Sequence, residues 1–220
     1  MILFKRFFSI FLLLTIVSPG VEAATLHPGD ADYQKALIAI QNGELRDAED
    51  HLREAVLAEP SNPQYHFELA NLYAVYHDDY KNQGDGAGAR YKMQQAAAEL
   101  EQAVMIHPDF LPAHFNLGVV YKNLERYEDA REEFKEVLRL DPSQNGALLQ
   151  IGQTYEAQGF YDDAESVYQE LEEKFPDDPR IQEALSQLQQ ERYEEQRDQL
   201  SQRQSRMNTL ASFFSQDSQQ

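Results

Sequence analysis

The stretch LPAHFNLGVVYKNLERYEDAREEFKEVLRLDP, residues 111–142, contains a pattern that returns along the chain. The following stretch, NGALLQIGQTYEAQGFYDDAESVYQELEEKFP, residues 145–176, repeats its spacing of apolar, small and aromatic residues. Pro142 and Pro176 end these two stretches, and Pro108 precedes Pro142 by the same interval. A fixed period of this length predicts an array of stacked units. The matching positions are Leu117-Gly118 and Ile151-Gly152, Tyr121 and Tyr155, Ala130 and Ala164, and Phe134 and Tyr168.

Two further copies precede these, each with a departure from the pattern. In residues 63–108, Leu69-Ala70 and Tyr73 match, but the second half follows only after an insertion at about positions 77–90. In residues 29–60 the match is degenerate, because Lys35 and Ala39 replace the expected leucine and tyrosine. A degenerate first copy is typical of the terminal cap of a repeat array.

The spacing within each copy predicts helices. Leu117, Val120, Tyr121 and Leu124 follow the i, i+3, i+4, i+7 order of one helix face. Asn42-Gly43 and Gly159 mark turns inside hairpins, and the prolines mark turns between them. No segment alternates with period two for long enough to form a strand, so we expect an all-α fold.

This order of residues resembles the tetratricopeptide repeat, whose pattern is L-G-x-x-Y, A-x-x-x-F and P on a period of about 34 residues. The resemblance implies an α-α superhelix of about four helical hairpins, residues 29–60, 63–108, 111–142 and 145–176. We expect residues 179–205 to form a capping helix that becomes long and polar, and residues 206–220 to form a disordered tail. The alternative for the tail is a short docking segment, built from Leu200, Met207, Leu210, Phe213 and Phe214.

The insertion at residues 77–90 predicts a longer second hairpin. About seven extra residues in each helix add about two turns and keep the same side facing inward. Tyr73, Tyr76 and Tyr80 are then expected to continue the inner stripe against Tyr91, beneath a glycine-containing tip. Such a tip is a candidate second contact site.

Residues 1–23 predict a secretory signal peptide. Lys5 and Arg6 precede an apolar run from Phe7 to Val17, and Val21-Glu22-Ala23 has the form of a cleavage site. We expect cleavage after Ala23 or Ala24 and a periplasmic or secreted protein. The alternative is an uncleaved anchor in the inner membrane, although the run is short for a span of roughly 20 residues.

Composition narrows the classes of function. The chain of 220 residues lacks cysteine and carries a formal charge of −19, which disfavours nucleic acid and favours basic partners at long range. No hydrolase, metalloprotease or phosphate-binding motif is present, so we expect neither an enzyme nor a cofactor, metal or small-molecule substrate. His66 and His114 occupy equivalent positions, where partial burial is expected and the repeat spacing prevents a shared metal ion.

The resemblance places the first helix of each hairpin on a concave groove. One row of the predicted groove residues is apolar, and the other row contains both apolar and polar residues. Such a groove suits an amphipathic helix or an extended peptide. A clamp for a C-terminal carboxylate is not expected, because lysine and arginine are missing at the matching positions beside Asn71 and Asn116. The predicted partner-binding residues are Tyr33, Leu37, Phe67, Asn71, Phe115, Val119, Leu149 and Gln153.

The leading hypothesis is therefore a protein–protein interaction scaffold of the bacterial cell envelope. The first alternative is a self-assembling structural component, which would use the ends of the array or the polar C-terminal helix. The second alternative, an enzyme, has no catalytic motif to support it.

Overall fold

In the computed structural model, residues 27–217 are described, and within that range the chain forms nine α-helices and no strand. This confirms the all-α prediction. The helices form four antiparallel hairpins followed by one long helix, and each hairpin falls within one of the four expected repeats. The bounds are α1 Asp30–Asn42, α2 Leu45–Ala58, α3 Pro63–Asn82, α4 Gly86–Ile106, α5 Leu111–Asn123, α6 Tyr127–Leu140, α7 Asn145–Ala157, α8 Tyr161–Lys174 and α9 Pro179–Asp217.

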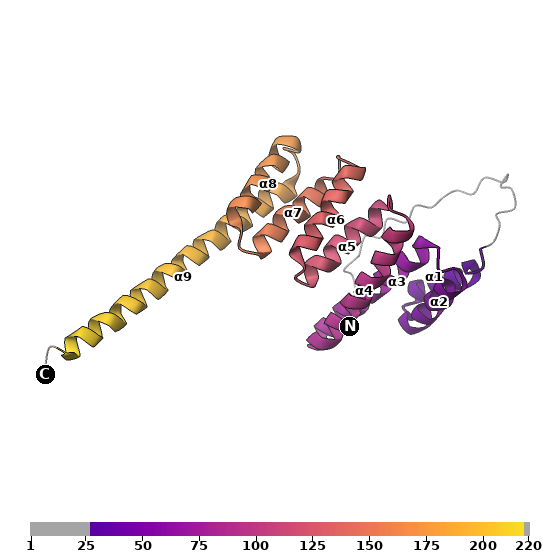
Figure 1. Cartoon of the computed structure of the whole chain (residues 1–220), viewed down its shortest axis with the longest axis horizontal. Helices are drawn as coiled ribbons and strands as arrows, with labels where there is room; N and C mark the ends of the chain where they lie inside the picture. Colours follow the sequence, from indigo (N-terminus) through magenta and orange to yellow (C-terminus); the bar gives the residue numbers. More distant parts are fainter. Residues whose placement is uncertain (1–26, 218–220) are drawn as a thin grey trace, which may run out of the picture.

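The hairpins stack in chain order, so that each helix packs mainly against its neighbours in sequence (Figure 1). A single hairpin cannot cover its own apolar face, and stacking buries that face in one continuous core. The second helices place small residues in this core: Ala48, Ala55, Ala96, Ala130 and Ala164 are each fully buried. They let adjacent helices approach closely, and the superhelix follows from this repeated contact.

Residue size is matched between the two helices of each hairpin. In the third hairpin a Cβ added at Gly118 would lie 2.7 Å from the ring of Phe134, and in the fourth a Cβ at Gly152 would lie 2.2 Å from that of Tyr168. At the equivalent positions the first two hairpins combine an alanine with a leucine, Ala36 with Leu52 and Ala70 with Leu100, all in the core. A glycine therefore faces a large ring, and an alanine faces the smaller leucine. Each pair fills a similar volume, which keeps the packing density constant along the stack.

The turns inside the hairpins use one backbone conformation at one repeat position. Gly43 and Gly159 have φ angles of 77° and 75°, in the left-handed region that ends many helices. Glu125 occupies the matching position with a φ of 62°, and is the non-glycine residue with positive φ among residues 27–217. The third hairpin therefore carries local backbone strain that the first and fourth avoid.

The second hairpin is extended, as the insertion predicts. Helices α3 and α4 contain 20 and 21 residues, against 13 and 14 in the third hairpin. Asp85 begins α4 by accepting a hydrogen bond from the backbone of Gly88 at 2.9 Å. The prediction for Tyr91 is wrong, because its side chain is 59% exposed while Ala89 and Met93 are buried. Tyr80 instead faces Gly88, where an added Cβ would meet its ring at 2.7 Å.

Helix α9 begins as a cap and continues as a solvated rod. Ile181, Ala184 and Leu188 are buried against the last hairpin, whereas residues 193–209 are exposed. The sequence predicts that this helix ends at residue 205 and that residues 206–220 form a disordered tail, but α9 extends to Asp217. The physical reason is that residues 180–217 contain no proline or glycine and are rich in glutamine, glutamate, arginine and leucine, which favour helix.

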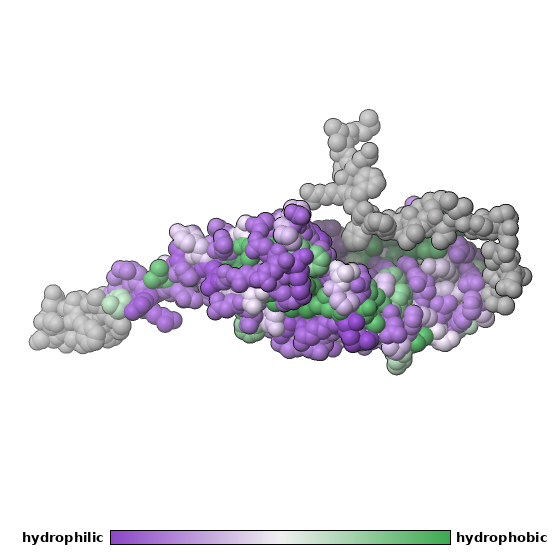
Figure 2. All heavy atoms as spheres, turned by 90° about the horizontal axis from the view of Figure 1, so that it is seen from above, coloured by the Kyte–Doolittle hydropathy of each residue, from purple (hydrophilic) through white to green (hydrophobic). Residues whose placement is uncertain are grey.

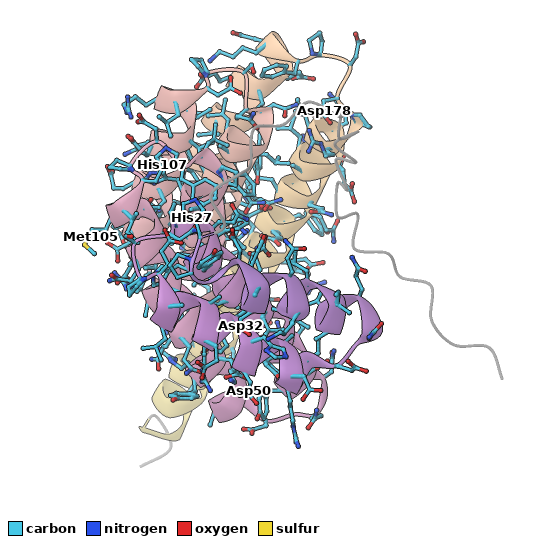
Figure 3. All side chains as sticks on the ribbon, turned by 90° about the vertical axis from the view of Figure 1, so that its right-hand side faces the viewer. His27, Asp32, Asp50, Met105, His107 and Asp178 are labelled. Carbon is cyan, nitrogen blue, oxygen red and sulfur yellow. The ribbon has the colours of Figure 1, made fainter. Side chains whose placement is uncertain are left out.

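The other end of the stack is polar. Figure 3 views it from the side of α1 and α2, where Asp32 bonds Lys35 at 2.7 Å and lies 3.6 Å from His51. These groups cover the first hairpin with side chains that water solvates well. The predicted signal peptide, residues 1–23, lies outside the described residues. Among the helices described, none has the length and apolar character required to span a bilayer.

Candidate partner-binding groove

The eight predicted groove residues lie on the first helix of each hairpin, α1, α3, α5 and α7. Seven of the eight side chains are half-buried, and Leu149 is buried, with 9% exposed. Leu149 therefore contributes to the core more than to an open surface. The remaining residues form what we call the inner face: Tyr33, Leu37, Phe67, Asn71, Phe115, Val119 and Gln153.

One row of the inner face is aromatic. Tyr33 packs on Tyr65, Phe67 on Phe110 and Phe115 on Phe134, with ring centroids 5.1, 5.1 and 5.6 Å apart. Each ring is thus anchored on one side by the fold and reaches the surface on the other. Such rings offer apolar contact area that loses little side-chain freedom when a partner binds. Hydrophobic residues gather over the central repeats in Figure 2, and hydrophilic residues surround them and cover most of α9.

A row of polar residues lies next to the aromatic row in the sequence of the first helices. This polar row is not among the predicted groove residues. It comprises the residues directly after the aromatic positions, Gln34, Glu68, Asn116 and Gln150. The signal was present, because these residues recur with the same spacing as Tyr33, Phe67, Phe115 and Leu149. Side-chain amides supply both donors and acceptors, which are the groups that a peptide backbone requires.

Hydrogen bonds join this polar row across neighbouring hairpins. The Asn116 amide donates to Asn71 Oδ1 at 2.8 Å, linking α5 to α3. Lys122 Nζ donates to Gln150 Oε1 at 2.6 Å and to Gln153 Oε1 at 3.1 Å, linking α5 to α7. Asn71 and Asn116, the two residues compatible with a clamp for a C-terminal carboxylate, are thus hydrogen-bonded to each other. These hydrogen bonds therefore link α3, α5 and α7 along the inner face.

Two charges on the inner face are partly withdrawn from water. Burial raises the pKa of Glu68, and the amides of Gln64 and Asn71, which favour its ionised form, offset part of that rise. Burial also lowers the pKa of Lys122, an effect that the nearby Glu156 carboxylate opposes. Glu68 and Lys122 are thus an acidic and a basic side chain on the first helices α3 and α5.

The two equivalent histidines are structural. His66 Nδ1 lies 2.7 Å from Glu99 Oε2 and its Nε2 lies 3.0 Å from the carbonyl oxygen of Pro60. His114 repeats this arrangement, with Nδ1 2.7 Å from Glu133 Oε2 and Nε2 2.8 Å from the carbonyl oxygen of Pro108. Because acceptors face both ring nitrogens, hydrogen bonding to the carboxylates raises the pKa of each histidine. Each ring ties a hairpin junction to the second helix.

Between residues 27 and 217 no group of three or more His, Asp or Glu side chains is arranged to hold a metal ion. The tip of the second hairpin, Gln83–Asp85, is an exposed turn in which Gly84 has a φ of 78°.

Comparisons with known proteins agree with this architecture. Models of the tetratricopeptide repeat match residues 33–75, 89–142 and 124–188, together about two thirds of the chain. The chain therefore belongs to the tetratricopeptide repeat family. Proteins of this family generally act as scaffolds for protein–protein interaction rather than as enzymes.

Solved structures of the same fold include several repeat proteins. MamA, residues 41 to the end, from Desulfovibrio magneticus RS-1 has a TM-score of 0.61 at 15% identity, covering 77% of this chain and 88% of that one. TTC0263 from Thermus thermophilus has a TM-score of 0.56 at 21% identity, covering 73% and 80%. YrrB has a TM-score of 0.58 at 18% identity, covering 72% and 74%. At these identities the likeness concerns the fold.

One curated relative is an enzyme of much greater length. It is a UDP-N-acetylglucosamine–peptide N-acetylglucosaminyltransferase of Giardia intestinalis, 29% identical over 77 residues. The match covers 35% of this chain and the chain spans about 5% of the relative's length. The similarity therefore concerns a short segment and carries no argument for glycosyl transfer here.

Proposed function

We propose that this protein is an adaptor of the bacterial cell envelope that binds a peptide or helix of another protein across the inner face. The observation that carries the proposal is the pairing of two adjacent rows, one aromatic and one polar and mostly of amides, on the first helices of successive hairpins. The aromatic row supplies apolar area, and the amide row supplies hydrogen bonds to a peptide backbone.

The hydrogen bonds already present in this surface support the same proposal. Asn71, Asn116, Lys122 and Gln153 are already bonded to neighbours, so binding orders mainly the partner. YrrB, which shares the fold, is described as having an unusual peptide-binding site. The proposal extends peptide binding to this chain, on residues that its own structure brings together.

Site-specific crosslinking in intact cells tests the groove. A photoreactive phenylalanine analogue replaces Val119, which is half-buried on the inner face. The matched control places the same analogue at Glu132 of α6, whose side chain is 71% exposed. We expect partner adducts from position 119 and none from position 132. Equal adducts from both positions, or adducts from position 132 alone, would contradict the groove assignment.

The envelope location rests on the predicted signal peptide. Osmotic shock followed by mass measurement of the intact chain tests it directly. We expect a periplasmic or secreted chain that begins at Ala24 or Thr25. A chain that begins at Met1 and sediments with membranes would instead support the uncleaved anchor.

Self-assembly remains the second candidate, and one feature of α9 favours it. Tyr193, Leu200 and Met207 are 63%, 65% and 62% exposed. They recur with the period of a heptad, which places a narrow apolar stripe on one side of the helix. Light scattering of the mature chain over a range of concentrations distinguishes the candidates. A concentration-independent monomer excludes self-assembly, and an oligomer that a chain ending at Glu194 cannot form supports it.

A further inference from the structure

Glu68 is a half-buried carboxylate without a cation beside it. It lies on α3 within the polar row, and between residues 27 and 217 no lysine, arginine or histidine nitrogen lies within 4.0 Å of it. Charged groups that are withdrawn from water are normally paired, because their desolvation is costly. The missing cation therefore needs an explanation.

Three half-buried carboxylates on the second helices have such a partner, whereas Glu156 on α7 resembles Glu68 in having no basic nitrogen within 4.0 Å among the described residues. Glu49 contacts Arg53 at 2.7 Å and Lys92 at 3.3 Å. Glu99 contacts His66 and Glu133 contacts His114, both at 2.7 Å. These three acids lie on second helices and are paired within the fold, whereas Glu68 lies on a first helix, in the polar row.

The Glu68 carboxylate is held in a fixed orientation. The Gln64 amide donates to Oε1 at 2.8 Å from one turn before, and the Asn71 amide reaches Oε2 at 3.5 Å from one turn after. Asn116 of the next hairpin donates to Asn71 Oδ1 at 2.8 Å, which fixes that amide with its nitrogen toward Glu68. Two neutral donors thus orient both carboxylate oxygens without neutralising the charge.

The charge of this carboxylate also acts on the first hairpin. Burial and, after it, the charge of Glu68 raise the pKa of Tyr33 on α1. A carboxylate that is oriented but not neutralised offers a cationic side chain a charge-assisted hydrogen bond. Lys122 differs, because its nitrogen already donates to two amide oxygens and is influenced by Glu156.

We propose that Glu68 binds a lysine or arginine side chain of the partner peptide and so sets the register of that peptide along the groove. This inference rests on the proposed function and specifies the chemistry of the partner. The net charge of −19 supports it, since long-range attraction steers basic segments toward the protein. One ion pair in a half-buried site adds specificity as well as affinity.

The test is selection from a displayed library of random dodecapeptides. The full mature chain and the variants Glu68→Gln and Glu54→Gln serve as separate targets. Both substitutions remove one negative charge, but Glu54 is exposed on α2. We expect peptides selected by the wild-type chain and by Glu54→Gln to share a lysine or arginine at one aligned position. We expect Glu68→Gln to lose that preference while it still selects peptides with the same apolar residues.

A selected peptide then gives the size of the effect. Replacing its aligned basic residue by norleucine should weaken binding to the wild-type chain about tenfold and leave binding to Glu68→Gln unchanged, as measured by fluorescence anisotropy. An equal loss on both proteins would overturn the pairing with Glu68 while leaving peptide binding intact. Failure of the wild-type chain to select any peptide would instead overturn the proposed function, and this inference with it.

Discussion

Replacing Gly152 by alanine tests whether the matched residue sizes hold the hairpins together. In the structure an added Cβ lies 2.2 Å from Cε1 of Tyr168, whereas ordinary contact begins at 3.4 Å. The ring must therefore move by about 1 Å, but Tyr168 is fully buried and its hydroxyl donates to Glu156 at 2.9 Å. Overpacking of this kind costs about 1–3 kcal/mol, and the helix propensity of alanine returns up to about 1 kcal/mol.

We expect Gly152→Ala to lower the free energy of unfolding by about 1–2 kcal/mol. The matched control is Gly146→Ala in the same helix, where the nearest atom of Phe115 is 3.7 Å away. That substitution should be neutral or stabilising by up to about 1 kcal/mol. Urea unfolding followed by far-ultraviolet circular dichroism measures both.

The first two hairpins suggest a compensating substitution. They combine alanine with leucine at these positions, so adding Tyr168→Leu to Gly152→Ala recreates their packing in the fourth hairpin. The double variant should lose less stability than the sum of the two single variants. If Gly152→Ala is as stable as Gly146→Ala, or if the two losses simply add, the size-matching argument is refuted.

Three further predictions concern the stack and its extension. His114→Gln should cost about 1–3 kcal/mol at pH 6 and less at pH 8, as urea unfolding at both values will show. The pKa of His114 is raised in the folded state. The stability that His114 contributes is therefore fully present below its ordinary pKa of 6.5 and is lost as the pH rises through the folded-state pKa. An equal cost at both pH values would contradict this reasoning. Glu125→Gly should stabilise the third hairpin by about 1 kcal/mol, because it removes the cost of a left-handed backbone at a side-chain-bearing residue; a lower melting temperature would count against that strain. A chain that ends at Glu194 should unfold within about 0.5 kcal/mol of the full chain, because substitutions and deletions of exposed surface usually change stability little. Residues 195–209 are exposed, and a larger loss would mean that the rod supports the stack.

The fold could be predicted because its determinants are local and recur. Gly118 and Gly152 with Phe134 and Tyr168 specify close helix pairs, and the regularly spaced prolines specify where pairs end. The length of α9 was not predicted, because a polar segment without an apolar face gives no periodic signal even where no residue breaks the helix. The inward position of Tyr91 was predicted wrongly, because the run of tyrosines does not reveal the helical register that buries Ala89 and Met93.

The candidate site could be predicted only in part. The period located the aromatic row, since Tyr33, Phe67 and Phe115 recur at one position. The sequence could not reveal that Asn116 bonds Asn71, or that no basic nitrogen within the described part of the chain pairs with Glu68, because those facts depend on contacts between neighbouring hairpins. Anchoring of the rings likewise follows from packing partners such as Phe110, which lies in a turn between hairpins.

The exposed part of α9 extends the molecule beyond the stack of hairpins. Beyond Arg192, which is ion-paired with Asp162 and Glu165 of α8, residues 193–217 extend away from the hairpins as a continuous helix. At a rise of about 1.5 Å per residue they reach about 40 Å. A partner held at the tip of that helix would be separated from one held near Glu68 by more than the width of a small domain. The protein could then engage two partners at once, without either one obstructing the other.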